Sequence, residues 1–193
     1  MKILIFTDSR GQHITKGAGH KVYGDMLSSL HGIEVEAYYC PFKWTTTVDF
    51  LVSFNRKKLR EYDLVLLQTG IVDFSPRTQS SANFDLYENI AEENKENLAL
   101  NTRDYTKKIK NHKKRFFDKI FGESSMKEHL RIPIDSYYNG EKTNNMYSLE
   151  MARIFLIPLL NNIPNLLYIN TNKIVKDWNG DYPRERPTNM SLI

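Results

Sequence analysis

The sequence predicts an α/β protein: a three-layer α/β/α sandwich around a parallel sheet, with a helical insert after the third strand. Short apolar segments alternate with helical patterns over residues 1–70, which is typical of βαβ units with right-handed crossovers. The run DLVLLQT at Asp63–Thr69 is almost continuously apolar, as expected of a parallel strand covered on both faces. The chain has 193 residues, 40% of them hydrophobic and 26% charged, which suits one globular domain.

Strands and helices are expected in turn along the first part of the chain. Lys2–Thr7 is apolar up to a polar turn and is expected to be a buried strand. Apolar residues recur at helical spacing over residues 22–30, and His31-Gly32 marks the end of that helix. Glutamates alternate with apolar residues over residues 33–37, which predicts a second strand. Residues 47–62 are expected to form one helix with a basic end, followed by the strand described above.

The insert, at about residues 78–143, departs from this alternation. Residues 84–100 are polar with sparse apolar positions and are expected to be helical. Residues 103–121 form a strongly basic helical pattern, and residues 122–143 are expected to be irregular. No internal repeat or low-complexity linker separates the insert from the rest, so residues 1–193 are interpreted as a single domain.

The alternation resumes after the insert. Residues 147–160 are predicted to form a helix, with Pro158 either kinking it or lying near its end. Residues 166–170, with the sequence LLYIN, are predicted to be a fourth strand. Residues 178–193 are rich in turn formers, so we expect this tail to fold over the carboxyl edge of the sheet.

Composition excludes several classes of protein. The mean hydropathy of −0.52 and the lack of a long apolar run exclude a membrane-spanning helix. The apolar run Ile3–Phe6 is too short for a secretory leader, so a cytoplasmic location is expected. A single cysteine, Cys40, excludes an intrachain disulfide and a cysteine-based zinc site. Gly17-Ala18-Gly19 matches neither a P-loop nor a dinucleotide fingerprint, so no cofactor and no metal are expected.

Polar segments follow the predicted strands at the points where the strands end. Asp8–Gly11 follows the first strand, and Gly70–Arg77 follows the third. Asn170–Asn172 follows the fourth strand, and Asp181–Arg184 comes shortly after it. Ligands of open parallel sheets bind at the carboxyl ends of the strands. These segments are therefore expected to converge on one site, although they are far apart in the sequence.

These segments resemble the motifs of the SGNH, or GDSL, hydrolase superfamily. Thr7-Asp8-Ser9 resembles the Gly-Asp-Ser of block I, and Gly70-Ile71-Val72-Asp73 resembles the Gly-x-Asn-Asp of block III. Asp181-Tyr182-Pro183-Arg184 is the nearest match to the C-terminal Asp-x-x-His. The resemblance implies a flavodoxin-like three-layer domain. The Gly-Ile-Val-Asp-x-x-Pro-Arg form is also similar to divergent members encoded among bacterial surface-polysaccharide genes.

The resemblance implies a serine esterase or acyl-transfer enzyme acting on a small or carbohydrate ester. Ser9 would be the nucleophile and Asp181 the acid that orients the base. The chain departs from the family at three places. Val72 stands at the asparagine position, the block II segment 40–46 lacks glycine, and Arg184 stands where the histidine is expected. Arginine cannot accept a proton at neutral pH, so either His20, His13 or, from the insert, His129 supplies the base, or the chemistry differs, or the site only binds.

A second reading makes the domain catalytically impaired and a binder of an anionic saccharide or other anionic ligand. Its ligand would be held by arginines at the strand ends: Arg10, Arg77, Arg184 and Arg186. Asp73 is expected beside them among the substrate-binding residues. Two plainer readings stay open for these loops. Asp8 would accept hydrogen bonds from nearby backbone, and Asp73 and Arg77 would form a local ion pair.

The basic segment at residues 103–119 allows a third reading. Basic helices bind nucleic acids or anionic membranes, and Phe116 and Phe117 would either stack on bases or pack the helix onto the domain. The net charge of only +4 favours a solvated helix face, so a nucleic-acid partner is not expected. The expected partner is a small molecule or carbohydrate.

Overall fold

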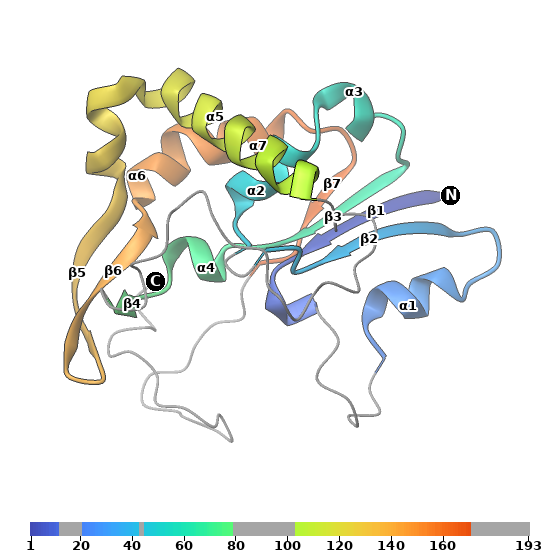
Figure 1. Ribbon diagram of the computed structural model, residues 1–193. Coiled ribbons are helices and arrows are strands. Elements are labelled where there is room, and N and C mark those ends of the chain that lie inside the picture. Colours follow the sequence, from blue (N-terminus) through green and yellow to red (C-terminus); the bar gives the residue numbers. More distant parts are fainter. Residues whose placement is uncertain (12–20, 43–44, 79–102, 171–193) are drawn as a thin grey trace.

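The computed structural model describes residues 1–11, 21–42, 45–78 and 103–170 (Figure 1). Its main sheet has four parallel strands in the order β2-β1-β3-β7. These strands are β1 (Lys2–Thr7), β2 (Glu34–Tyr39), β3 (Leu64–Gln68) and β7 (Leu166–Tyr168). The α/β class and all four predicted strands are therefore confirmed, and β1 has the predicted bounds.

Alternation along β1 sends side chains to both faces of the main sheet. Leu4 and Phe6 belong to one apolar cluster, together with residues of α2 (Thr47–Ser53) and α3 (Arg56–Leu59). Ile3 and Ile5 belong to another cluster, which α1 (Tyr23–Ser28) joins through Tyr23 and Leu27. Figure 1 shows α1 on one side of the sheet and α2 and α3 on the other. Both faces of β1 are therefore buried, which explains its continuous apolar sequence.

The single helix expected over residues 47–62 is in fact two helices. Phe54 ends α2 in an extended conformation, with φ −125° and ψ 120°, and its side chain is buried. The Asn55 side chain then accepts a hydrogen bond from Lys58 N at 2.9 Å and so caps α3. Asparagine competes with helix continuation through its side-chain oxygen, and burial of Phe54 favours the bend.

The prediction that residues 122–143 are irregular is wrong. The long helix α5 (Arg103–His129) is interrupted at Gly122, and a hairpin of β5 (Leu130–Tyr138) and β6 (Glu141–Tyr147) follows it. Asn139 and Gly140 turn the hairpin with φ values of 51° and 74°, the left-handed pair that two-residue hairpin turns need. The insert is therefore helical only in part, and the region expected to be helical at 84–100 lies outside the described residues.

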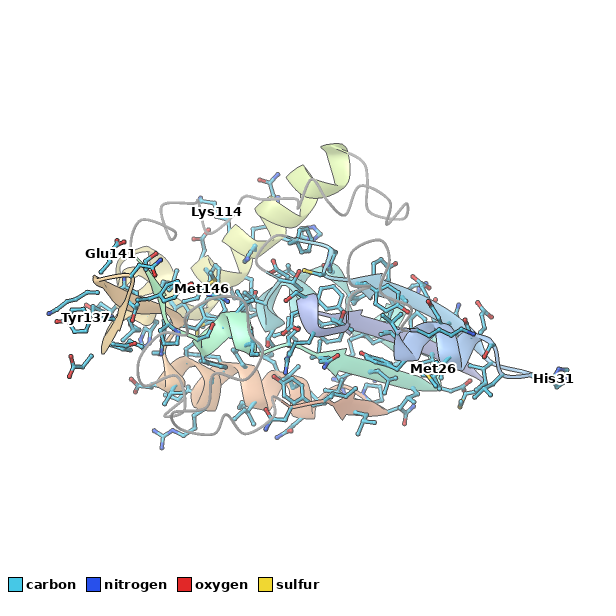
Figure 2. The ribbon with its side chains drawn as sticks, turned by 90° about the horizontal axis from the view of Figure 1, so that it is seen from below. Met26, His31, Lys114, Tyr137, Glu141 and Met146 are labelled. Carbon is cyan, nitrogen blue, oxygen red and sulfur yellow. The ribbon has the colours of Figure 1, made fainter. Side chains whose placement is uncertain are left out.

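The hairpin belongs to a second, smaller sheet. Its strands are ordered β4-β6-β5, where β4 (Arg77–Thr78) follows the loop after β3. Figure 2 shows Tyr137 and Glu141 at one end of the molecule and His31 at the other. The pairing of β4 with β6 joins the insert to the loop after β3, because Arg77 is opposite Asn144.

The helix expected over residues 147–160 begins later and is not regular. Tyr147 still belongs to β6, and the Ser148 side chain caps α6 (Leu149–Met151) by accepting from Met151 N at 3.0 Å. A π-helical turn, η4 (Ala152–Leu156), then leads into α7 (Ile157–Asn161). Proline lacks an N–H and clashes with the preceding turn of a regular helix. The wider π turn accommodates Pro158 in the first turn of α7.

The insert packs on the domain through α5. Phe117 is buried in a cluster with Val48 of α2 and Tyr147 of β6, which confirms packing rather than base stacking for this ring. Lys114, Arg115 and Lys119 are exposed, in agreement with a solvated helix face. Lys113 is the exception, because it is buried and its Nζ lies 2.8 Å from Asp49 Oδ1. Within the described residues, no helix is long and apolar enough to cross a membrane.

Candidate active site

The strand order has a topological switch point between β1 and β3. The chain continues from β1 to β2 on one side of β1, and it continues from β3 toward the other side of the sheet. The two loops therefore start next to each other but lead in opposite directions. Ligands of doubly wound sheets bind at such a switch point. Asp8 follows β1 directly, and its N–H donates to Gln68 O of β3 at 2.8 Å. The loops after β1 and β3, which include Asp8-Ser9 and Gly70–Asp73, are therefore adjacent.

Ser9 lies where the sequence places it, directly after the central strand. It is exposed and begins a short 3₁₀ turn, η1 (Ser9–Gly11). The Gly11 N–H closes this turn on Asp8 O at 3.1 Å. A Cβ at position 11 would lie 2.5 Å from a methyl carbon of Thr7, so the turn fits against β1 only with glycine there. The fold thus presents the Ser9 hydroxyl beyond the end of β1.

Asp8 is fully buried and binds Arg10. Its carboxylate accepts from Arg10 N at 3.0 Å, which confirms the reading of Asp8 as a backbone acceptor. The same carboxylate accepts from Arg10 Nε at 2.9 Å and from Arg10 Nη2 at 2.8 Å. The sequence left two readings of Arg10 open, a solvated side chain and a contact with an anionic ligand, and in the structure its Nε and Nη2 atoms donate to a carboxylate of the chain itself.

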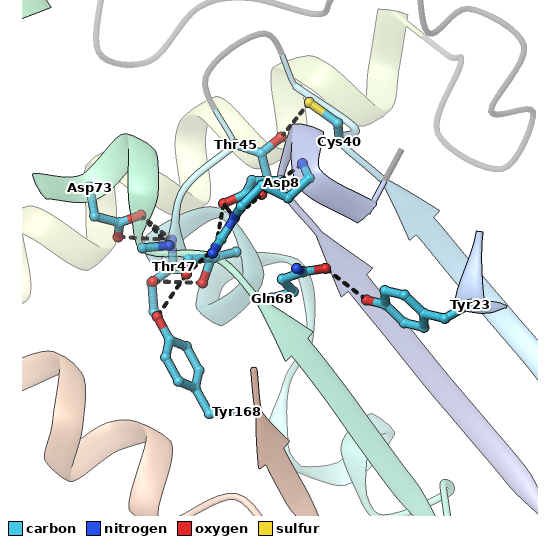
Figure 3. Close-up of polar contacts among 11 residues, drawn as sticks. Asp8, Tyr23, Cys40, Thr45, Thr47, Gln68, Asp73 and Tyr168 are labelled. Atoms are coloured by element: carbon cyan, nitrogen blue, oxygen red, sulfur yellow. Dashed lines mark hydrogen bonds and ion pairs between the residues drawn. The ribbon is translucent and has the colours of Figure 1, made fainter. Parts of the chain in front are cut away.

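The carbonyl of Thr69, the residue after β3, accepts two hydrogen bonds, one from the turn after β1 and one from β7. It accepts from Arg10 Nη2 at 2.8 Å and from the Tyr168 hydroxyl of β7 at 2.9 Å. The Thr69 side chain lies 2.8 Å from the hydroxyl of Thr47, the first residue of α2. Figure 3 shows Asp8, Thr47, Asp73 and Tyr168 gathered at the ends of the strands. A polar network thus joins the turn that carries Ser9 to the end of β3, to β7 and to the start of α2.

Asp73 lies in the short helix α4 (Ile71–Phe74) and is buried. Its carboxylate accepts from Thr47 N at 3.0 Å and from Gly70 N at 3.2 Å, so it joins the first turns of α2 and α4. Burial raises the pKa of Asp73 to about 7, against the opposing effect of the Thr47 N–H and with a further increase from the Asp49 carboxylate. These contacts give Asp73 a structural part in the loop.

Gly70 turns the chain from β3 into α4. Its φ is 109°, and a Cβ there would lie 2.7 Å from the Tyr168 hydroxyl. We expect Gly70→Ala to destabilise the protein by about 2 kcal/mol, because backbone strain and displacement of this hydroxyl add together. Gly32→Ala is the matched control, since Gly32 has φ 76° but open space around it, and should cost about 1 kcal/mol. Urea unfolding measures both, and equal costs would contradict the contact with Tyr168.

The residue that follows β2 has a left-handed backbone although it is not glycine. Cys40 has φ 45°, in the left-handed region, and its N–H donates to Thr7 O at 2.8 Å. The Thr45 hydroxyl closes the following loop by donating to Phe42 O at 2.7 Å. The Cys40 N–H is therefore engaged by β1. Val72 is buried in the cluster with Phe117.

Tyr23 and Gln68 flank the network on the side of α1. The Tyr23 hydroxyl donates to Gln68 Oε1 at 3.2 Å (Figure 3). Burial raises the pKa of Tyr23, and the nearby Tyr39 and Asp8 raise it further, so this hydroxyl stays protonated at neutral pH. Sequence reasoning missed these two residues, as well as the roles of Thr69 and Tyr168. Polar residues that end otherwise apolar strands are the signal that marks Gln68 and Thr69.

Five of the predicted site residues lie outside the described residues: His13, His20, Asp181, Arg184 and Arg186. Arg77 is half-buried in β4. The described histidines lie elsewhere: His31 in an exposed turn, His112 with Nδ1 3.3 Å from Val52 O, and His129 stacked on Phe121. Among the described residues, no cluster of three or more His, Cys, Asp or Glu side chains could hold a metal ion.

Comparison with protein-family models, with curated proteins and with solved structures finds no match to this chain.

Proposed function

We propose that this protein is an SGNH-like serine hydrolase or acyltransferase with Ser9 as its nucleophile. The observation that carries the proposal is the exposed position of Ser9 on a turn at the switch point between β1 and β3. The β2-β1-β3 order matches the start of the flavodoxin-like order 2-1-3-4-5. The proposal includes the three-layer form of the fold and one domain over residues 1–193.

The proposed chemistry is acyl transfer through a covalent intermediate. The Ser9 hydroxyl attacks the acyl carbon of the ester, and a histidine accepts its proton. The leaving alcohol takes this proton when the tetrahedral intermediate collapses, and water or another alcohol then releases the acyl group. His20 is the proposed base, with His13 as the alternative and Asp181 as its orienting acid. The substrate is proposed to be a small ester or a carbohydrate ester. The proposed location of the protein is the cytoplasm, and its proposed process is polysaccharide biosynthesis.

The contacts of Arg10 weigh against the reading of the domain as an anion-binding module without catalysis. That reading needs Arg10, Arg77, Arg184 and Arg186 around one ligand. Asp8 already accepts from the Nε and Nη2 atoms of Arg10 and balances its charge. The charge beside Ser9 is therefore compensated within the chain.

Labelling with a fluorophosphonate tests the proposal without knowledge of the substrate. An activated serine displaces fluoride and forms a phosphonate ester, which intact-mass and peptide spectrometry locate. We expect one adduct, on Ser9, and its loss in Ser9→Ala. Ser28→Ala is the control, because Ser28 is an exposed serine in α1 and its removal should leave labelling unchanged.

The same variants are then assayed on short-chain activated esters. Wild type should turn over slowly, and Ser9→Ala should lose this turnover, since removal of a nucleophile costs several orders of magnitude in rate. An unlabelled Ser9 in folded wild-type protein would refute the proposal.

A further inference from the structure

The turn that carries Ser9 has little stability of its own. It spans three residues, and the Gly11 N–H to Asp8 O bond closes it. A single hydrogen bond of this kind contributes only about 1 kcal/mol. A nucleophile must nevertheless be held close to its reactive geometry, because small displacements are costly in rate. The turn therefore depends on contacts made by its neighbours.

Arg10 makes those contacts from inside the turn. Its main-chain N–H and its Nε both donate to Asp8 Oδ1, at 3.0 and 2.9 Å, while Nη2 donates to Oδ2 at 2.8 Å. Main chain and side chain of one residue thus hold the same carboxylate. Such paired bonds between a guanidinium and a carboxylate fix geometry as well as adding energy.

Arg10 also joins the turn to the neighbouring strand. Its Nη2 donates to Thr69 O at 2.8 Å, and this carbonyl accepts a second bond from Tyr168 at 2.9 Å. The Asp8 side chain is completely buried, and the Arg10 side chain is 21% exposed. The pair is therefore largely sheltered from water and from screening by salt.

We propose that Arg10 is a positioning residue that holds Ser9 in place at the switch point, and that it does not bind the substrate. This inference rests on the proposed function of Ser9. It follows from the geometry, because the Nε and Nη2 atoms of Arg10 donate to Asp8 and Thr69. A lysine ammonium keeps the charge, but it cannot reproduce the planar set of hydrogen bonds that the guanidinium donates to Asp8 and Thr69.

The first test compares the kinetics of Arg10→Lys and wild type in fluorophosphonate labelling. Positioning predicts that the maximal labelling rate falls about a hundredfold while the half-saturating probe concentration is unchanged. Inorganic phosphate should not protect Ser9 in wild type. The control is Arg56→Lys, an exposed arginine of α3, which should behave as wild type.

A change confined to the half-saturating concentration, together with protection by phosphate, would assign Arg10 to ligand binding instead. An unchanged labelling rate in Arg10→Lys would also overturn the inference.

The second test does not need catalysis. In wild type, the Arg10 Nε–H should give a resolved ¹H–¹⁵N resonance that exchanges slowly with water, because Asp8 is buried. In Arg10→Lys, the main-chain N–H groups of residues 10 and 11 should exchange with water at least about tenfold faster than in wild type.

The two tests separate the two proposals. A fast-exchanging Nε–H in a wild type that is labelled at Ser9 would overturn the role of Arg10 alone. A protected Nε–H in a wild type that is not labelled would overturn the proposed function, and with it any positioning role for Arg10 in catalysis.

Discussion

Lys113→Met is expected to destabilise the protein by about 3–5 kcal/mol, because it leaves a buried carboxylate without its counter-ion. Lys113 Nζ lies 2.8 Å from Asp49 Oδ1, and the two side chains are only 7% and 4% exposed. Asp49 is at the same time the acidic residue of the capping box of α2, since its Oδ2 accepts from N and Oγ1 of the N-cap residue Thr46 at 2.8 Å each. The uncompensated charge would therefore lie within the first turn of that helix.

The matched control is the adjacent residue. Lys114 is 65% exposed on the side chain, and its Nζ lies 3.8 Å from Asp118. Lys114→Met should change the free energy of unfolding by no more than about 0.5 kcal/mol. Urea unfolding followed by circular dichroism measures both variants. A loss of less than about 1 kcal/mol in Lys113→Met would show that the pair is not buried in solution.

Asp73 is expected to make the protein less stable as the pH rises from about 4 toward about 7. Its pKa is raised from 3.8 to about 7, chiefly by burial, so the folded state keeps a proton that the unfolded state releases. Each pH unit in this window removes about 1.4 kcal/mol from this contribution. The stabilisation is complete below the unfolded pKa and is lost once the pH exceeds the folded pKa.

Asp73→Asn should remove this dependence while its side-chain oxygen still accepts from Thr47 N. Between about pH 5 and about pH 8, the unfolding free energy of wild type should fall by about 2–3 kcal/mol more than that of Asp73→Asn. Asp118→Asn, on the exposed side of α5, should keep the wild-type slope. Parallel pH profiles of wild type and Asp73→Asn would show that this carboxyl does not titrate differently in the folded state.

The main sheet could be predicted because its strands carry strong local signals. β1 and β3 are apolar on both faces, and buried strands of this kind need no knowledge of their partners to be recognised. The hairpin of β5 and β6 was missed because β6, with the sequence EKTNNMY, is polar although it is buried from Thr143 to Tyr147, so it lacks the apolar alternation that marks a half-buried strand. The Asn139-Gly140 pair is a local indication of a hairpin turn.

The site could be predicted only in its position. The end of β1 and the end of β3 follow from the strand pattern, so the positions of Ser9 and Asp73 after these strands were predicted correctly. The direction of a side chain does not follow from the pattern. Arg10 faces Asp8, two residues away, and Asp73 faces Thr47, which belongs to a different helix. Tyr168 joins the network across 99 positions of sequence, a distance at which local reasoning has no information.

The helix α2 has a consequence for how this chain can be shortened. Leu51 and Val52 pack against the apolar cluster beneath the sheet and also against the cluster built by α5, β6 and α6. The segment between β4 and β7 therefore cannot be deleted without loss of contacts that α2 makes. A truncated version that joined β4 directly to β7 would uncover one side of α2, along with the carboxylate of Asp49. The minimal unit of this architecture is larger than its parallel sheet and the helices that connect it.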